Sequence, residues 1–409
     1  MKKTLWTRNF TLLTMATVLG AAGGIAGNFA LSFLVYDETG STFAAALLIA
    51  INVIPNFIIP LIAAPIMDRL PRKPFLVGGD LVNGILYGLA GLYLLNLDFS
   101  YLGYLVFSLL LSSLSAFDSL AYNSIYPKLI TEGLEEKGYT VSGMIYPVMQ
   151  VIMAPVAAFL FSTIGVGNIL LIQGGLSILA ATLESRIRIT ETRNRSGDKF
   201  TFHLWRQDLK AAVSYLRREK GLQSIYSYMA FTNGVSGGLN PILVAFFRTA
   251  PGFGIAMYSF FSVAEFIGRS IGGLLHYHIE IPQKKRFSFA FFVYQTYEFM
   301  DMILLWLPYP FMLFNRAICG FLGINSATMR EASVQRYIPE EFRARINAFS
   351  TVLYSVGYSI LSLVIGALGE ILDYRVCMTI CAAVTSVVCW FTVWRGRNDV
   401  RKIYNRLEE

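Results

Sequence analysis

Basic residues and long apolar runs alternate along this chain in a pattern that leaves few folds open to it. Threading the apolar runs back and forth through a bilayer puts all but four of the 34 lysines and arginines on one side. Short basic segments stay in the cytoplasm during membrane insertion. The pattern therefore predicts an inner-membrane protein with both termini in the cytoplasm. The twelve runs are 10–36, 42–67, 75–97, 101–126, 139–163, 165–184, 221–247, 255–277, 287–307, 309–330, 347–369 and 375–394.

The composition supports the same class of protein. The chain has 409 residues, of which 55% are hydrophobic and only 15% charged, too apolar a mixture for a soluble globular protein. A span needs about 20 apolar residues to cross a hydrocarbon core about 30 Å thick. The formal net charge of +8 predicts no nucleic-acid partner, because the cations lie in short loops beside lipid headgroups. We expect an all-α protein embedded in the lipid bilayer, its first run an uncleaved span.

Residue types that carry enzyme chemistry are scarce and scattered. Gly-Lys occurs nowhere, so there is no phosphate-binding Walker A loop, and the three histidines make no metal site. The cysteines lie within the tenth and twelfth runs, where disulfides and zinc are not expected. We therefore predict no enzyme, no metal and no cofactor. The cysteines are Cys319, Cys377, Cys381 and Cys389.

The sequence indicates two halves that repeat the same arrangement of spans. Pro71, Pro127 and Asn28 recur as Pro282, Pro339 and Asn240 at an offset of about 212 residues, as in transporters built from repeats. Apolar residues within 202–215 predict a helix that either lies on the membrane surface or links the halves in solvent. The predicted parts are an N-terminal six-helix bundle (1–184), a cytoplasmic linker (185–220), a C-terminal six-helix bundle (221–394) and a cytoplasmic tail (395–409).

The segment after the second run carries a known signature. Asp68, Arg69, Arg72 and Lys73 match a Gly-x-x-x-Asp-Arg-x-Gly-Arg-Lys pattern, in which Ala64 and Pro71 replace the two glycines. This pattern resembles the loop between spans two and three of the major facilitator superfamily. Segments 35–41 and 337–347 resemble its drug-exporter branch, which includes macrolide and siderophore efflux proteins. The resemblance implies twelve transmembrane helices in two pseudo-symmetric six-helix bundles.

The resemblance also implies a role for the signature residues. Asp68, Arg69, Arg72 and Lys73 would form a latch that closes and opens as the transporter changes conformation. By the helical rise, Asp80 lies about 8 Å in from the cytoplasmic end of the third run, near enough to be a partner of the loop arginines. The alternative is that the cations only fix the topology.

One segment departs from the exporter pattern. Exporters of this superfamily often carry glycines and Gly-Pro in span five, whereas residues 150–158 keep Pro155 and have no glycine. The small alanines still permit close helix packing. A proton-coupled importer of a small metabolite therefore stays open as an alternative.

Ionisable residues inside spans are costly and mark functional sites. Glu298 and Asp301 share a helix face, and Arg316 in the next, antiparallel run lies at the depth of Asp301. An Asp301–Arg316 pair would leave Glu298 as the freer carboxylate and the better candidate for a proton site.

Three more ionisable residues are candidates for proton coupling. Glu265 and Arg269 are four residues apart, in the favourable order for a helical ion pair, so they either neutralise each other or exchange partners on protonation. Asp118 either carries a proton or caps a cavity on the cytoplasmic side.

Polar uncharged residues within the spans suit a large amphipathic cavity. The candidates for lining it are Asn28, Tyr122, Tyr146, Gln150, Asn233, Asn240 and Tyr294.

These observations rank the functions. The first hypothesis is a monomeric secondary transporter that expels a small amphipathic organic compound, such as a drug, antibiotic or siderophore, in exchange for protons. The second is the proton-coupled importer. A non-transporting membrane scaffold or receptor comes third, because such a protein does not need charges inside its spans.

Overall fold

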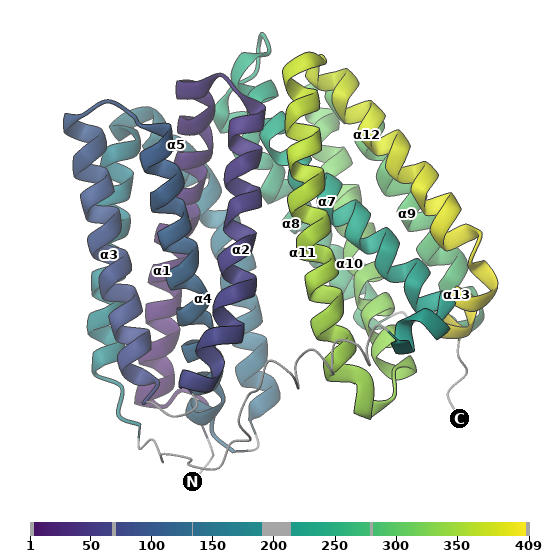
Figure 1. Cartoon of the computed structure of the whole chain (residues 1–409), viewed down its shortest axis with the longest axis horizontal. Helices are drawn as coiled ribbons and strands as arrows, with labels where there is room; N and C mark the ends of the chain where they lie inside the picture. The colour runs from purple at the N-terminus through teal and green to yellow at the C-terminus, as the bar shows by residue number, and fades with distance from the viewer. Residues whose placement is uncertain (1–3, 68–70, 133, 190–213, 279–280, 406–409) are drawn as a thin grey trace. The chain divides into compact units, whose positions relative to one another are not determined.

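The computed structural model describes residues 4–67, 71–132, 134–189, 214–278 and 281–405, and all regular structure in these segments is helical. The chain divides into two compact units. Unit 1 comprises Met1–Gly40 and Ile51–Lys199, and unit 2 comprises Ser41–Ala50 and Phe200–Glu409. Figure 1 draws the helices of unit 1 in purple to blue and most of those of unit 2 in teal to yellow. The predicted linker helix falls largely in 190–213, outside the described residues.

Five long helices make up unit 1 in the part of the chain that the structure describes. The first begins at Thr7, whose hydroxyl accepts the Phe10 N–H, and ends at Gly40, whose φ of 63° suits a residue without a side chain. The last is broken by Gly165, where φ is 76° and ψ is 172°. This break separates the two spans predicted at 139–163 and 165–184. The helices are α1 (Arg8–Thr39), α2 (Thr42–Met67), α3 (Lys73–Asn96), α4 (Tyr101–Leu129) and α5 (Glu135–Ser185).

The described residues of unit 2 contain six long helices and a short C-terminal one. Short helical turns lie at Gln283–Lys285 and Leu304–Trp306, and a π-helical turn at Trp390–Trp394 extends the last long helix. The helices are α7 (Lys220–Thr249), α8 (Ile255–His278), α9 (Arg286–Ile303), α10 (Tyr309–Tyr337), α11 (Glu340–Ile371), α12 (Tyr374–Cys389) and α13 (Arg397–Tyr404).

Within the described residues, the long helices match the twelve predicted apolar runs when α5 is counted as two. By length and composition alone, six helices of the described chain are apolar enough to cross a membrane, and α7 to α10 are not among them. Three of these four carry buried or paired charges that lower their hydropathy. The predicted all-α membrane fold is confirmed, and unit 2 holds the more polar set of spans.

The two units repeat the same helix pairings. In unit 1, both α1 and α3 pack against α5, while Asn52 of α2 accepts hydrogen bonds from Ser108 and Ser112 of α4 at 2.9 and 2.7 Å. In unit 2, α7 packs against α11, α9 against α12 and α8 against α10. Each pairing in one unit has its counterpart in the other, which is the arrangement expected of pseudo-symmetric bundles.

Glycines allow α8 and α10 to approach closely. A Cβ atom at Gly268 would lie 1.9 Å from the Ala317 carbonyl oxygen, and one at Gly320 would lie 2.1 Å from the Glu265 carbonyl oxygen. Both obstacles are backbone atoms, which cannot move aside as a side chain does. Helices in membranes associate through such small residues because lipid supplies no hydrophobic drive between them.

The first turns of α2 belong to unit 2. The Glu370 carboxylate of α11 accepts hydrogen bonds from the Ser41 hydroxyl at 2.7 Å and from the Phe43 N–H at 2.8 Å. The Thr42 hydroxyl, fully buried, lies 2.8 Å from the Gly366 carbonyl oxygen. A carboxylate at a helix N-terminus satisfies free N–H groups and the positive end of the helix dipole.

The segment predicted as a tail forms α13 and joins the core of unit 2. Val400, Ile403 and Tyr404 are buried in a cluster with residues of α7, α9 and α10. The Asn405 side chain accepts from the Phe287 N–H at 3.0 Å and donates to the Lys284 carbonyl oxygen at 3.1 Å. The C-terminal helix is therefore part of the bundle.

Candidate functional site

A buried ion pair lies between α9 and α10 in unit 2. Arg316 donates to the Asp301 carboxylate and, at 3.0 Å, to the Asn315 side chain, which itself donates to the Met300 carbonyl oxygen at 2.8 Å. The short turn between the two helices makes them antiparallel neighbours, so residues 15 apart meet. Asp301 is 9% exposed and Arg316 is 8% exposed. The predicted Asp301–Arg316 pair is confirmed.

Glu298 lies one turn before Asp301 on α9 and has a different environment. It is 4% exposed, and its Oε1 accepts hydrogen bonds from the Tyr228 and Thr232 hydroxyls of α7, each at 3.3 Å. No cation among the described residues pairs with it. A buried carboxylate bound only by neutral hydroxyls gains stability when it takes up a proton, because burial disfavours its charge.

A tyrosine cluster extends from Glu298 toward α13. The ring of Tyr228 lies 4.9 Å from that of Tyr294, and the Tyr294 and Tyr404 hydroxyls are 3.0 Å apart. Tyr294, predicted to line a substrate cavity, is thus buried among other side chains. Arg330 on α10 is a neighbour of the Tyr294 side chain.

On α8, Glu265 and Arg269 form an ion pair with each other. Arg269 donates from Nη2 at 2.6 Å and from Nε at 3.1 Å to the same Glu265 oxygen. The Arg269 side chain is largely exposed at the surface of the described chain. The structure confirms the pairing, while the predicted role in proton coupling stays a prediction.

Three carboxylates meet in unit 1. Asp80 of α3, Asp118 of α4 and Glu184 of α5 lie close enough to repel one another, and no salt bridge reaches them within the described segments. Glu184 is 4% exposed, and its Oε2 and Asp118 Oδ1 are buried without hydrogen-bond partners. Sequence reasoning assigned Asp80 to the latch and missed Glu184, although an acidic residue at the end of the apolar run 165–184 was a visible signal.

Only part of the predicted latch lies within the described residues. Asp68 and Arg69 lie outside the described residues. Lys73, at the start of α3, donates from Nζ to the Ser185 carbonyl oxygen at 2.6 Å, at the end of α5. Arg72 is the residue before α3.

The other predicted cavity residues differ in how far they are exposed. Asn28, Asn233 and Asn240 occupy exposed positions, and Asn240 accepts from the Tyr258 hydroxyl at 2.6 Å. Tyr146 is also exposed, and Gln150 is partly buried. Tyr122 has its hydroxyl 3.1 Å from the Ser142 hydroxyl.

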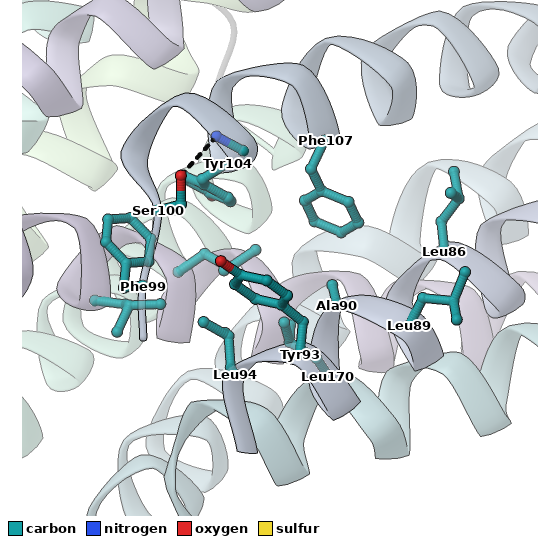
Figure 2. A pocket seen from close by; sticks show the side chains of 13 residues that line it. Leu86, Leu89, Ala90, Tyr93, Leu94, Phe99, Ser100, Tyr104, Phe107 and Leu170 are labelled. Carbon is teal, nitrogen blue, oxygen red and sulfur yellow. Dashed lines mark hydrogen bonds between the residues drawn. The ribbon is translucent and has the colours of Figure 1, made fainter. Parts of the chain in front are cut away.

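Unit 1 also contains an apolar pocket that the sequence did not indicate. It measures about 280 Å³ and is lined by residues of α1, α3, α4 and α5 without any acidic or basic side chain. Figure 2 shows Tyr93, Tyr104 and Phe107 around it. The Ser100 hydroxyl accepts a hydrogen bond from the Gly103 N–H at 3.3 Å. With so few polar groups, this pocket suits hydrocarbon rather than an ionised ligand.

No group of three or more His, Cys, Asp or Glu side chains in the described segments is arranged to hold a metal ion. The four cysteines are free and buried, which suits small packing residues.

Comparisons with known proteins agree with this architecture. A curated relative from Bacillus subtilis (strain 168), an uncharacterized MFS-type transporter called YkuC, is 24% identical over 246 residues, which is 56% of this chain. The chain thus spans about half (54%) of that relative's length.

Two solved structures share the fold over nearly the whole chain. A bacterial homolog to the human lysosomal transporter Spinster, inward-facing and unoccupied, matches with a TM-score of 0.70 at 14% identity, over 99% of this chain and 100% of that one. The nucleoside transporter NupG matches with a TM-score of 0.72 at 12% identity, over 95% and 99%. The family profile described as Major Facilitator Superfamily matches residues 11–296 and 299–408. This protein belongs to the major facilitator superfamily.

Proposed function

We propose that this protein is a secondary active transporter that expels an amphipathic organic compound in exchange for protons by alternating access. The observation that carries the proposal is Glu298, a buried carboxylate whose hydrogen-bond partners are hydroxyl groups and whose neighbour Asp301 already neutralises Arg316. A carboxylate in this position is stable when protonated and costly when charged. Binding and release of its proton therefore change the energy of unit 2 in a way that can drive a conformational change.

The carboxylates Asp80, Asp118 and Glu184 supply a second candidate for proton uptake. These three acids lie near one another and have no salt bridge to a cation among the described residues, so they repel one another, and protons relieve this repulsion. Their positions on α3, α4 and α5 would couple a proton to the packing of unit 1. The Asp68–Arg69–Arg72 segment would then act as the latch that resemblance to the family implies.

Export is favoured over import by the segments 35–41 and 337–347, which resemble drug exporters. Import of a small metabolite is the second candidate, because α5 keeps Pro155 but lacks the glycines of the exporter motif.

The test is a transport assay in proteoliposomes with an imposed pH gradient. Cationic, neutral and anionic amphipathic compounds would be screened for movement against the direction of proton flow. We expect flux of at least one compound to need the gradient and to stop with a protonophore. Movement in the same direction as protons would replace export by import, and flux that ignores the gradient would remove proton coupling.

A further inference from the structure

A polar cavity of about 320 Å³ lies inside unit 2, where α10 ends and α11 begins. Its walls come from α7, α10 and α11, and they hold a cation, an acid, two amides, two aliphatic hydroxyls and two tyrosines. The cavity is separate from the Glu298 hydrogen bonds and from the Asp301–Arg316 pair, none of whose members lines it. By the positive-inside reasoning, this end of the unit faces the cytoplasm.

Arg330 is the cation in this wall, and its partner differs from those of the other embedded arginines. Arg269 and Arg316 each donate to a carboxylate, whereas Arg330, partly buried, has the neutral Tyr294 side chain as its neighbour. No ion pair joins it to an acid within the described segments. A guanidinium taken partly out of water without an anion loses solvation that one neutral hydroxyl does not fully replace.

The acid in the wall does not neutralise this cation. Glu331 follows Arg330 directly, and neighbouring residues on a helix do not face each other. The Glu331 carboxylate instead accepts from Gln335 at 2.9 Å, and Gln335 also donates to Asn347 at 3.0 Å. The amides and the acid are therefore occupied with one another, and Arg330 keeps donors for a further partner.

The rest of the wall suits the organic part of such a partner. The rings of Tyr226 and Tyr354 lie 6.1 Å apart and border the cavity, while Ser350 and Thr351 donate their hydroxyl hydrogens to the Asn347 carbonyl oxygen, each at 2.9 Å. We propose that this cavity binds the carboxylate or phosphate group of a small organic anion, with Arg330 as its anchor and the two tyrosines beside its apolar part.

The chemistry of the guanidinium fits this assignment. Its planar fork donates two parallel hydrogen bonds to a carboxylate or phosphate, which a lysine does not reproduce. Small-molecule pockets measure roughly 300–1,000 Å³, so the cavity has room for one ring and its anionic group. If the bound anion is the transported compound, the substrate carries a negative charge, and this part of the inference rests on the proposed function. Binding itself does not depend on that proposal.

The experiment measures binding rather than flux. Isothermal titration calorimetry on the purified full-length protein in a non-ionic detergent would use phenylphosphate and benzoate as anionic probes and benzamide as a neutral one. We expect one molecule of either anion to bind per chain and benzamide to bind at least tenfold more weakly. Arg330→Gln should weaken anion binding at least tenfold, and Arg330→Lys should weaken it by a smaller factor.

Arg336→Gln is the matched control, because Arg336 is an exposed cation on the same helix and does not line the cavity. It should bind phenylphosphate as the unmodified protein does. Equal binding by a folded Arg330→Gln protein, judged by gel filtration and thermal unfolding, would overturn the proposal. So would equal affinity for benzamide.

The natural anion has two possible sources, and nanodiscs separate them. Phosphatidylglycerol that competes with phenylphosphate, while phosphatidylcholine does not, would assign the site to a lipid headgroup. Phenylphosphate affinity that is equal in both lipids would assign it to a soluble solute. Both results keep Arg330 as the anchor, and neither depends on whether Glu298 carries a coupling proton.

Discussion

Among individual side chains, Glu298 makes the sharpest prediction. Glu298→Gln keeps the shape and the hydrogen bonds of a protonated carboxyl group but cannot release a proton. We expect this variant to reach the membrane in normal amounts and to lose flux driven by a pH gradient. Uptake into proteoliposomes with and without the gradient would measure the loss. Unchanged proton-driven transport in the variant would remove Glu298 from the mechanism.

Asp301 makes a prediction about stability instead. Asp301→Asn leaves Arg316 as a buried cation without its carboxylate, which should destabilise unit 2 by about 3 kcal/mol. The double variant Asp301→Asn, Arg316→Gln should be more stable than the single one, because neither charge is then left alone. Thermal unfolding in detergent would compare them. A single variant as stable as the unmodified protein would show that the pair contributes little.

Ion pairs could be predicted from the sequence where the geometry of one helix, or of two consecutive helices, is enough to bring the two side chains together. Glu265 and Arg269 are four residues apart on one helix, and Asp301 and Arg316 flank one short turn, so both pairs followed from helical spacing. Glu184 and Arg330 lie at the ends of apolar runs, where a residue belongs equally well to a loop. Their burial depends on how three helices rotate against each other, which one sequence does not specify.

Among the helices, the contact between α8 and α10 gives the clearest test of packing. Gly320→Ala places a methyl group 2.1 Å from a backbone oxygen of α8, so the helices must separate. We expect a loss of about 2 kcal/mol, the usual cost of overpacking a tight contact. Thermal unfolding of the purified protein would measure it.

Gly273→Ala is the control for this prediction. Gly273 lies on α8, the partner of α10 in this contact, and a methyl group there meets nothing within 4 Å. This variant should unfold at the temperature of the unmodified protein or slightly above it. Equal effects of the two substitutions would mean that close approach of the helices does not stabilise unit 2.

The long helices followed from the sequence because each needs a long apolar run and the bilayer sets its length. α13 did not follow, although Val400, Ile403 and Tyr404 have helical spacing. In a segment of eight residues that is rich in charge, three apolar residues are too few to distinguish an amphipathic helix from a polar tail. Its helix is stabilised by contacts with α7, α9 and α10, which only the folded unit supplies.

For the chain as a whole, the signature segment between α2 and α3 makes a prediction about rate. Asp68→Asn would remove the negative charge of the proposed latch with little change in the size of the side chain. We expect turnover to slow more than substrate binding weakens, because a latch acts on the change of conformation. Initial rates over a range of substrate concentrations separate the two. A fall in affinity with unchanged turnover would contradict the assignment.

The division into two similar halves was also within reach of the sequence. Landmarks at a constant offset predicted a duplication, and the matching pairs α1 with α5 and α7 with α11 agree with it. The exception is the start of α2, which groups with unit 2 through Glu370 and Thr42. No pattern marks this exchange, because it depends on a contact between residues more than 300 positions apart.

The place of α13 in the bundle bears on how this protein can be handled. The Tyr404 hydroxyl is hydrogen-bonded to that of Tyr294, and the Asn405 side chain accepts from the Phe287 N–H at the start of α9. Cutting the chain at Trp394 would therefore expose buried aromatic rings. An affinity tag or a fluorescent reporter attached after Glu409 leaves these contacts in place. Trimming the last fifteen or so residues to aid crystallisation would instead yield a protein that aggregates on extraction from the membrane.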